Sequence, residues 1–433
     1  MQRQAQVKIW KAEALPSDWF KRRKTDQKAT EQIESDVKTI ISQVKENGDK
    51  ALTELTEKFD KAKLTTKNLK VTAEEIKEAY RKTSQKQVVA LKFMQEKVST
   101  FQKQQLNQTE TKTTYDGITV QTVLRPIESV GCYVPGGQAA YPSTLIMTAV
   151  PAKVAGVPRI VVCSPPDADG KVNSLVLVAA EICGVDEVYK VGGAQAIAAL
   201  AYGTETVKSV RKIVGPGSKY VTVAKVLVSK DVAIDMPAGP SEVLVLADET
   251  ADALLIAYDM ISQAEHGRDS VAGLITTSEK VALQVRDSLS CLAASAERGK
   301  KILEALENYG FIIICKSIGE AASLVNKFAP EHLEVMTSEP KEIADKLTAG
   351  LILLGSYSPV ALSDYGSGTN HVLPTGGFAQ AFSGLSVFDF TRRVSIVEGS
   401  KVGLEKVKDN IKVMAEAENL PNHYRAIQAR FEK

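Results

Sequence analysis

Short β-branched runs alternate with alanine-rich runs of helical spacing from about residue 127 onward, and this alternation constrains the fold most. In a first series, the sequence predicts strands at 159–163, 187–191, 212–215 and 232–236 and helices at 174–183, 194–202 and 220–228. A second series follows, in which helical runs separate strands at 242–246, 273–276, 311–315 and 351–354. Strands that alternate with helices in this way form βαβ units. The sequence therefore predicts an α/β protein with two parallel sheets, which could share one architecture.

The flanking regions have a different pattern. Residues 1–115 are rich in Lys, Glu, Gln and Thr, and apolar residues recur at helical spacing on both sides of a break at Asn47-Gly48. This region is predicted to be helical, with a solvated charged face. The segment from about residue 380 is also predicted to be helical. It is too short to form a core of its own, so we expect an appended tail.

Length and charge limit the classes of function. A chain of 433 residues exceeds one compact core, so two or more domains are expected. The net charge of +2 gives no support for nucleic acid or a membrane surface as partner. We find neither a long apolar run nor the apolar core of a signal peptide. Five dispersed cysteines indicate reduced thiols and a cytoplasmic protein (132, 163, 183, 291 and 315).

Glycine-rich turns follow the strands of the first series. They lie at 133–137, 191–195 and 214–218, where a strand is followed by a helix. Backbone amides at such turns favour a phosphate or another anion, and open α/β sheets bind ligands there. The dinucleotide fingerprint is incomplete, because Tyr220 stands in place of its third glycine. The glycines therefore predict either a nucleotide site or tight turns alone.

The chain has only four histidines, and all lie beyond residue 265 (His266, His332, His371 and His423). Gln263 and His266 are three residues apart at the end of a predicted helix, so they share one face and could reach one metal ion. Asp364 and His423 could complete a zinc site. For any one of these residues, the alternative is a hydrogen-bonded polar side chain.

Glu331 and His332 are adjacent, so they cannot share a helical face and suit a loop or strand end. There they could offer two proton-transfer groups. The alternative is an exposed loop pair. His371 could line the same site or brace a loop.

These residues fall in sequence blocks that together resemble the histidinol dehydrogenase family over essentially the whole chain. The blocks are VGCYVPGG (130–137), YPSTLIMTAVPAKVAGV (141–157), GGAQAIAALAYGTE (192–205), IDMPAGPSEVLVLAD (234–248), ISQAEHG (261–267), APEHLE (329–334), YSPVALSDYGSGTNHVLPTGG (357–377) and SGLSVFDF (383–390).

The resemblance implies two Rossmann-like, aldehyde-dehydrogenase-like parallel-sheet domains with helical N- and C-terminal extensions. The expected parts are an N-terminal extension (1–25), a first α/β domain (26–128 plus 240–380), a second, NAD-binding α/β domain (129–239) and a C-terminal tail (381–433). It also implies a homodimer in which the tail of one subunit helps to complete the active site of the other.

The resemblance further implies NAD-linked oxidation of L-histidinol to L-histidine through an enzyme-held aldehyde, the last steps of histidine biosynthesis. One zinc ion per subunit is expected. The implied zinc ligands are Gln263, His266, Asp364 and His423, and the implied acid/base pair is Glu331 and His332. Substrate contacts are implied for Ser241, Gln263, His266, His332, Asp364, Glu418 and His423. NAD contacts are implied for Tyr133, Gln195 and Ser218.

Two residues depart from the family pattern. Ser218 stands where asparagine is usual, and its hydroxyl lacks the paired donor and acceptor of an amide, which puts that NAD contact in doubt. Asn419 replaces a glycine, but asparagine tolerates positive φ. Two alternative functions remain open: a related zinc and NAD dehydrogenase of another small alcohol, such as a sulfonated propanediol, and a zinc hydrolase without nicotinamide.

Overall fold

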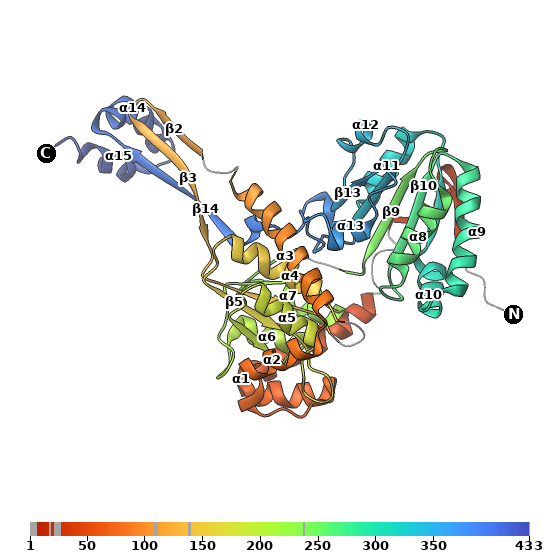
Figure 1. Cartoon of the computed structure of the whole chain (residues 1–433). Helices are drawn as coiled ribbons and strands as arrows, with labels where there is room; N and C mark the ends of the chain where they lie inside the picture. Colours follow the sequence, from red (N-terminus) through yellow and green to blue (C-terminus); the bar gives the residue numbers. More distant parts are fainter. Residues whose placement is uncertain are drawn as a thin grey trace.

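The computed structural model has two α/β lobes and a projecting arm (Figure 1). It describes residues 7–16, 19–20, 27–107, 111–136, 140–236 and 239–432. Much of the expected N-terminal extension therefore lies outside the described residues. Gly137, the last glycine of the first glycine-rich turn, also lies outside them.

The first lobe is built on a parallel sheet with the spatial order β6-β5-β4-β7-β8. In chain order this is 3-2-1-4-5, the order of a Rossmann sheet. Its strands are β4 (Ser129–Tyr133), β5 (Arg159–Cys163), β6 (Glu187–Tyr189), β7 (Lys212–Val214) and β8 (Ala233–Ile234). The connecting helices are α4 (Pro142–Val154), α5 (Ser174–Ile182), α6 (Gly193–Tyr202) and α7 (Lys219–Val228).

The second lobe repeats this order and adds one strand at the edge: β1-β11-β10-β9-β12-β13, all parallel. The strands are β1 (Lys8–Lys11), β9 (Glu242–Ala247), β10 (Val271–Thr276), β11 (Phe311–Ile314), β12 (His332–Met336) and β13 (Leu351–Leu354). The helices are α8 (Ala253–Ala264), α9 (Glu279–Ser295), α10 (Gly299–Tyr309), α11 (Ile318–Phe328), α12 (Pro340–Ala344) and α13 (Val360–Tyr365). Both predicted parallel sheets, and their shared architecture, are confirmed.

Two strands of the second lobe differ from the prediction. Strand β1 lies in the region expected to be helical, because its hydrogen-bond partner is β11, some three hundred residues away. Strand β12 was not predicted, since His332 and Glu334 interrupt its apolar run. Both cases show that pairing and burial, rather than local pattern, decided the element.

The N-terminal helices pack on the first lobe. They are α1 (Gln27–Asp60), α2 (Ala73–Lys82) and α3 (Gln85–Leu106). Helix α1 contacts α6 and α7, α2 contacts α5, and α3 contacts α4. Val37 and Leu52 of α1 share a core with Ile197 of α6. The prediction grouped 26–128 with 240–380 instead. The difference arises because the apolar face of α1 lies over α6, whereas most of its charged side chains are exposed; Asp49, at 4% exposure, is buried.

The arm joins distant segments of the chain. Strands β2 (Thr111–Tyr115), β3 (Ile118–Pro126) and β14 (Thr391–Gly399) form an antiparallel sheet, and helices α14 (Lys401–Ala417) and α15 (Pro421–Gln428) follow. The tail was predicted to be helical, so the strand at 391–399 corrects that prediction; β14 forms because residues 118–126 offer it a full-length partner. The arm extends away from both lobes (Figure 1).

Short 3₁₀ helices complete the described structure at Ala12–Ala14, Thr66–Asn68, Phe378–Gln380 and Val387–Phe390. Within the described ranges, no helix combines the length and apolarity needed to cross a membrane. All five cysteines are unpaired, and four are buried; Cys291 is exposed.

Candidate active site

The predicted proton-transfer pair lies at the amino ends of the strands in the second lobe. Glu331 directly precedes β12 and His332 begins it, which confirms the expected strand-end position. Both residues are buried, at 7% and 4% exposure, so the alternative of an exposed pair is wrong. Ala329, with a left-handed backbone (φ 45°), turns the chain from α11 into this segment.

Helices bring further predicted residues to the same edge of the sheet. In a parallel sheet, each crossover helix runs back from the carboxyl end of one strand to the amino end of the next. Gln263 and His266 therefore lie at the end of α8, and Asp364 lies near the end of α13. Ser241 precedes β9 at this edge, where its carbonyl accepts a hydrogen bond from Val271 N at 3.0 Å.

Glu331 is fixed by a partner that the sequence did not reveal. The backbone N–H of Glu242 donates to Oε2 of Glu331 at 2.8 Å, and Glu331 N–H donates to Oε2 of Glu242 at 3.3 Å. Oε1 of Glu242 accepts from Gly376 N–H at 3.1 Å. Burial raises the pKa of Glu331 well above its usual value, and the charges of Glu242 and Asp364 add to this rise. Glu331 is thus held in place as a carboxyl group that retains its proton readily.

His332 presents an unprotonated ring nitrogen. Its Nδ1 lies 3.1 Å from the carbonyl oxygen of Glu242, which can only accept, so Nδ1 carries the hydrogen. Nε2 is buried and has no hydrogen-bond partner among the described residues. Burial lowers the pKa of His332 to about 4, so the ring is neutral near pH 7. Its Nε2 is therefore available to take a proton from a ligand.

The predicted metal ligands of the second lobe differ in exposure. Gln263 is buried at 2% exposure, whereas His266 is exposed. Desolvation nonetheless lowers the pKa of His266, against the opposing charge of Asp364. Nδ1 of His371 lies 3.4 Å from Oδ1 of Asp364, the contact expected of a bracing residue.

Asp364 is stabilised as a carboxylate. Burial alone would raise its pKa, but the hydrogen bond to His371 and the charges of His371, His332 and His266 bring the pKa below its usual value. Asp364 and these three imidazoles therefore lie within electrostatic reach of one another. Within the described residues, no three His, Cys, Asp or Glu side chains are close enough together to hold a metal ion.

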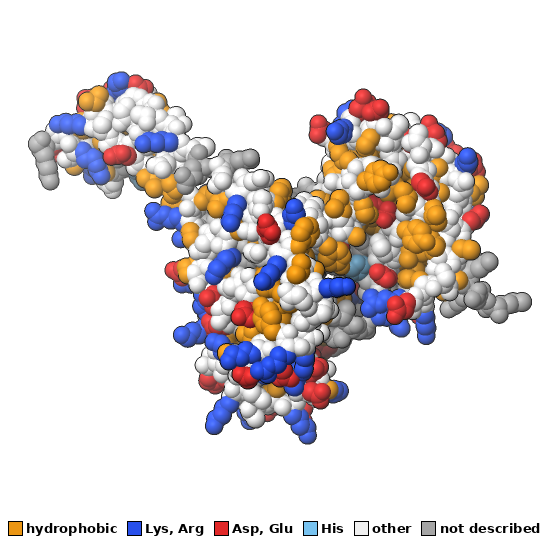
Figure 2. Space-filling model, in the orientation of Figure 1, with side chains coloured by type: hydrophobic (Ala, Val, Ile, Leu, Met, Phe, Trp, Pro, Cys, Tyr) orange, Lys and Arg blue, Asp and Glu red, His pale blue; other side chains and the backbone are white. Residues whose placement is uncertain are grey.

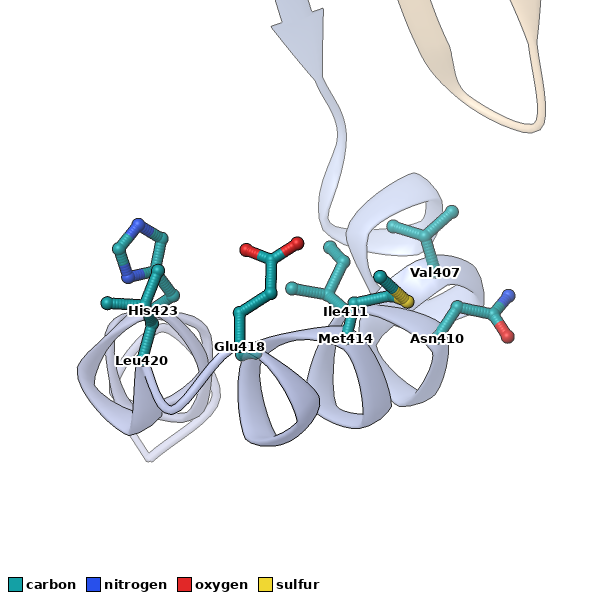
Figure 3. A pocket seen from close by; sticks show the side chains of 8 residues that line it. Val407, Asn410, Ile411, Met414, Glu418, Leu420 and His423 are labelled. Atoms are coloured by element: carbon teal, nitrogen blue, oxygen red, sulfur yellow. The ribbon is translucent and has the colours of Figure 1, made fainter.

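The remaining predicted residues of this site lie on the arm. Glu418 and His423 are exposed and project to the same side, at a pocket of about 370 Å³ (Figure 3). Apolar side chains make up most of its lining: Val407, Ile411, Met414, Ala415 and Leu420. Within one chain the arm is remote from α8 and α13 (Figure 1), so a single chain does not bring His423 to the other predicted ligands. Asn419 has a φ of 55°, as its replacement of glycine predicts.

The residues predicted to contact NAD lie in the first lobe, at the carboxyl ends of its strands. Tyr133 ends β4, and its hydroxyl accepts a hydrogen bond from Gly193 N–H at 3.1 Å. Gln195, in the first turn of α6, is 1% exposed, and its Nε2 has no partner among the described residues. Ser218 is exposed at the start of α7 and makes no capping hydrogen bond. An unused buried donor at a helix N-terminus suits a polar ligand.

Comparisons with known proteins agree over nearly the whole chain. The family model described as histidinol dehydrogenase matches residues 22–431. The histidinol dehydrogenase of Clostridium acetobutylicum is 48% identical over 93% of this chain and 94% of its own length. That of Methanocaldococcus jannaschii is 47% identical over 92% and 93%. A crystal structure of histidinol dehydrogenase from Elizabethkingia anophelis superposes with a TM-score of 0.92 at 36% identity, covering 100% of this chain and 99% of that one.

The chain belongs to the histidinol dehydrogenase family. It is therefore an enzyme, an oxidoreductase. Both its Rossmann-order sheets carry candidate site residues, at opposite kinds of strand end: carboxyl ends in the first lobe and amino ends in the second.

Glu242 is the residue of the candidate site that the sequence analysis did not identify. It holds both Glu331 and Gly376, and its carbonyl sets the tautomer of His332. A signal was present, because a glutamate begins the otherwise apolar strand Glu-Val-Leu-Val-Leu-Ala. A buried carboxylate is rarely retained without a polar partner.

Proposed function

We propose that the chain catalyses the zinc-dependent, NAD-linked, four-electron oxidation of L-histidinol to L-histidine through an enzyme-held aldehyde, the last steps of histidine biosynthesis. Membership of the family supports the substrate. The observation that carries the proposal is the buried Glu331–His332 pair, whose Nε2 has no partner within the described residues. An isolated buried nitrogen of this kind suits a group that receives a proton from substrate.

The donor set fits zinc. Gln263, His266 and Asp364 converge from two helices on the edge where His332 begins its strand, and they offer one amide oxygen, one imidazole nitrogen and one carboxylate oxygen. We propose these as three ligands, with His423 of a second copy as the fourth. Zinc accepts such oxygen and nitrogen donors and would orient the imidazole and amine of the substrate.

The proposed chemistry assigns one role to each member of the pair. Nε2 of His332 takes the hydroxyl proton of histidinol as hydride leaves its carbon for one NAD⁺, which yields the aldehyde. Glu331 assists the addition of water to that aldehyde. The resulting hydrate loses a second hydride to a second NAD⁺, and two protons, to give the carboxylate. Burial raises the pKa of Glu331, and a carboxyl group with such a pKa both gives and takes protons closer to neutral pH.

Other residues would bind the substrate and the cofactor. We propose Ser241 and Glu418 as substrate contacts alongside Gln263, His266, His332, Asp364 and His423. Tyr133, Gln195 and Ser218 are proposed for NAD, with the unpartnered Nε2 of Gln195 as the supporting observation. Dispersed unpaired cysteines support a cytoplasmic location.

A homodimer with exchanged arms would complete the site. Hydrophobic side chains gather on the visible face of the right-hand lobe (Figure 2). The exposed apolar residues of α8 and α13 in that lobe include Leu254, Tyr258, Leu362 and Tyr365. The arm also exposes Val402, Val413 and Met414. Exposed apolar area of this kind marks an association surface.

A stoichiometric assay tests the proposal. Purified protein receives L-histidinol and excess NAD⁺, and the NADH absorbance is followed to completion. We expect two NADH per histidinol, loss of activity with a chelator and recovery on addition of zinc. If NADH formed from a sulfonated propanediol and none formed from histidinol, the proposed substrate would change to the propanediol. Hydrolysis without any NADH would overturn the proposal.

A further inference from the structure

Beneath the candidate site, a buried carboxyl group on one element meets a half-buried carboxyl group on another. Glu334 of β12 is 1% exposed. Its carboxyl group lies within hydrogen-bonding reach of Asp259 of α8, and its Oε1 accepts from the backbone N–H of Val360, which begins α13, at 2.8 Å. One side chain thus connects the strand and the two helices that carry the proposed site residues.

Each of the three contacting residues lies two or four positions along the sequence from a proposed site residue. Glu334 is two positions after His332, on the same face of the strand. Asp259 is four positions before Gln263, on the same face of its helix. Val360 is four positions before Asp364, at the other end of α13. A shift of Glu334 would therefore be transmitted to all three proposed groups.

A hydrogen bond between these two carboxyl groups requires that one of them carries a proton. Oε2 of Glu334 has no donor among the described residues, and an ionised Asp259 could only accept. Burial and the facing carboxyl group are the main influences on both residues, and the groups that act on them include no cation. The strand neighbours of Glu334 in the sheet are Val245 and Leu353, both apolar. A buried carboxylate beside a half-buried one, without a cation, is costly unless one proton lies between them.

We propose that Glu334 and Asp259 share one proton and that this acid pair is a positioning element, which fixes His332, Gln263 and Asp364 relative to one another. The positional part rests on the proposed function, whereas the shared proton does not. Glu334 touches no reacting atom and acts only through the residues it holds.

Amide variants separate the two parts. Glu334→Gln and Asp259→Asn each supply a permanent N–H donor across the pair, so both should keep kcat and KM close to those of the parent. Glu334→Leu removes the connection, and we expect kcat to fall by about tenfold or more at a smaller change in KM, because small misplacements of reacting groups are costly. Glu342→Gln, on the exposed surface of α12, is the matched control.

The shared proton has a readout that needs neither zinc nor histidinol. Burial raises the pKa of Asp259 to about 6 and raises the pKa of Glu334 well above its usual value. In the unfolded chain both groups lose their protons near pH 4, so the folded state binds more protons above that pH and the midpoint of thermal unfolding falls as pH rises through 6. In both amide variants this fall should shrink by roughly 2–4 °C. Infrared spectra of the metal-free parent should show protonated-carboxyl absorption, to which Glu331 also contributes, and both amide variants should lose the part that belongs to the Glu334–Asp259 pair.

The outcomes are distinct. An unchanged pH dependence in both amide variants, with the protonated-carboxyl absorption undiminished from that of the parent, would overturn the shared proton. A Glu334→Leu protein with parental kcat and KM would overturn the positioning role. Absence of histidinol oxidation in the parent would refute the proposed function, while the unfolding and infrared results would still decide whether the proton is shared.

Discussion

Gly48 shows how a single residue sets the course of a long helix. Its backbone is non-helical (φ 51°, ψ −131°), which confirms the break predicted at Asn47-Gly48. A Cβ there would lie 2.2 Å from Oε2 of Glu205, the atom that accepts a hydrogen bond from Asp49 N–H at 2.7 Å. The kink therefore needs a residue without a side chain, for backbone and packing reasons together.

A graded glycine series tests this account. We expect Gly48→Ala to lower the free energy of unfolding by about 2–4 kcal/mol, since it adds both strain and a clash. Gly355 also has a positive φ (79°) but faces open space, so Gly355→Ala should cost only about 1 kcal/mol. Gly399 has neither feature, and its alanine variant should be near neutral. Chemical denaturation measures all three, and equal losses at Gly48 and Gly399 would contradict the account.

The proposed acid/base pair gives a second prediction at the residue scale. His332→Asn removes the nitrogen that has no partner, and Glu331→Gln removes the ionisable oxygen. Each should lower kcat by about 10²–10⁴-fold while zinc content stays that of the parent. Steady-state kinetics and metal analysis of the same preparation check both quantities. Full turnover of zinc-loaded His332→Asn would exclude His332 as the proton acceptor.

At the scale of elements, a buried ion pair braces the turn after β7. Asp235 accepts from Gly215 N–H at 2.7 Å, Lys225 donates to the Gly215 carbonyl at 2.9 Å, and the two side chains form a salt bridge. Both are nearly inaccessible, at 7% and 4% exposure. The turn that leads to Ser218 is thus held by α7 and β8 together.

Removing the cation of this ion pair alone should lower the free energy of unfolding far more than removing both charges. Lys225→Met leaves a buried Asp235 without its cation, and we expect a loss of about 3–5 kcal/mol in the free energy of unfolding. Lys225→Met combined with Asp235→Asn should recover much of that loss, because no buried charge remains. Denaturant titration of the single and double variants measures the difference. An additive double variant would mean that the two side chains do not act as a pair.

At the scale of the whole molecule, the arm decides whether one chain suffices. Two variants test the exchange: His332→Asn damages the lobe site, and His423→Asn damages the arm. Each alone should be inactive. If arms are exchanged, a mixed dimer regains one intact site, and refolding an equal mixture should restore about a quarter of parental activity. Recovery that is absent despite mixed dimers, detected by two different affinity tags, would mean that each arm serves its own chain.

Local pattern predicted much of the two sheets. β-branched runs and alanine-rich runs differ in periodicity over a few residues, so strands such as β5 and β13 were predicted with their observed bounds. The edge strand β1, the polar strand β12 and the arm strand β14 were not predicted, because each depends on a partner strand distant in sequence. Propensity does not encode that pairing.

The candidate site, too, has features that the sequence predicted and features that only the tertiary structure revealed. By itself, the sequence identified the family, the parallel α/β architecture and the adjacent Glu331 and His332, since these follow from residue order and short-range periodicity. Only the tertiary structure placed that pair at the amino ends of the strands, supplied Glu242 as its partner and left Nε2 of His332 buried without one. It also showed His423 on an arm remote from the other predicted ligands. Burial and long-range hydrogen bonding arise only when distant segments pack together, so residue order alone does not specify them.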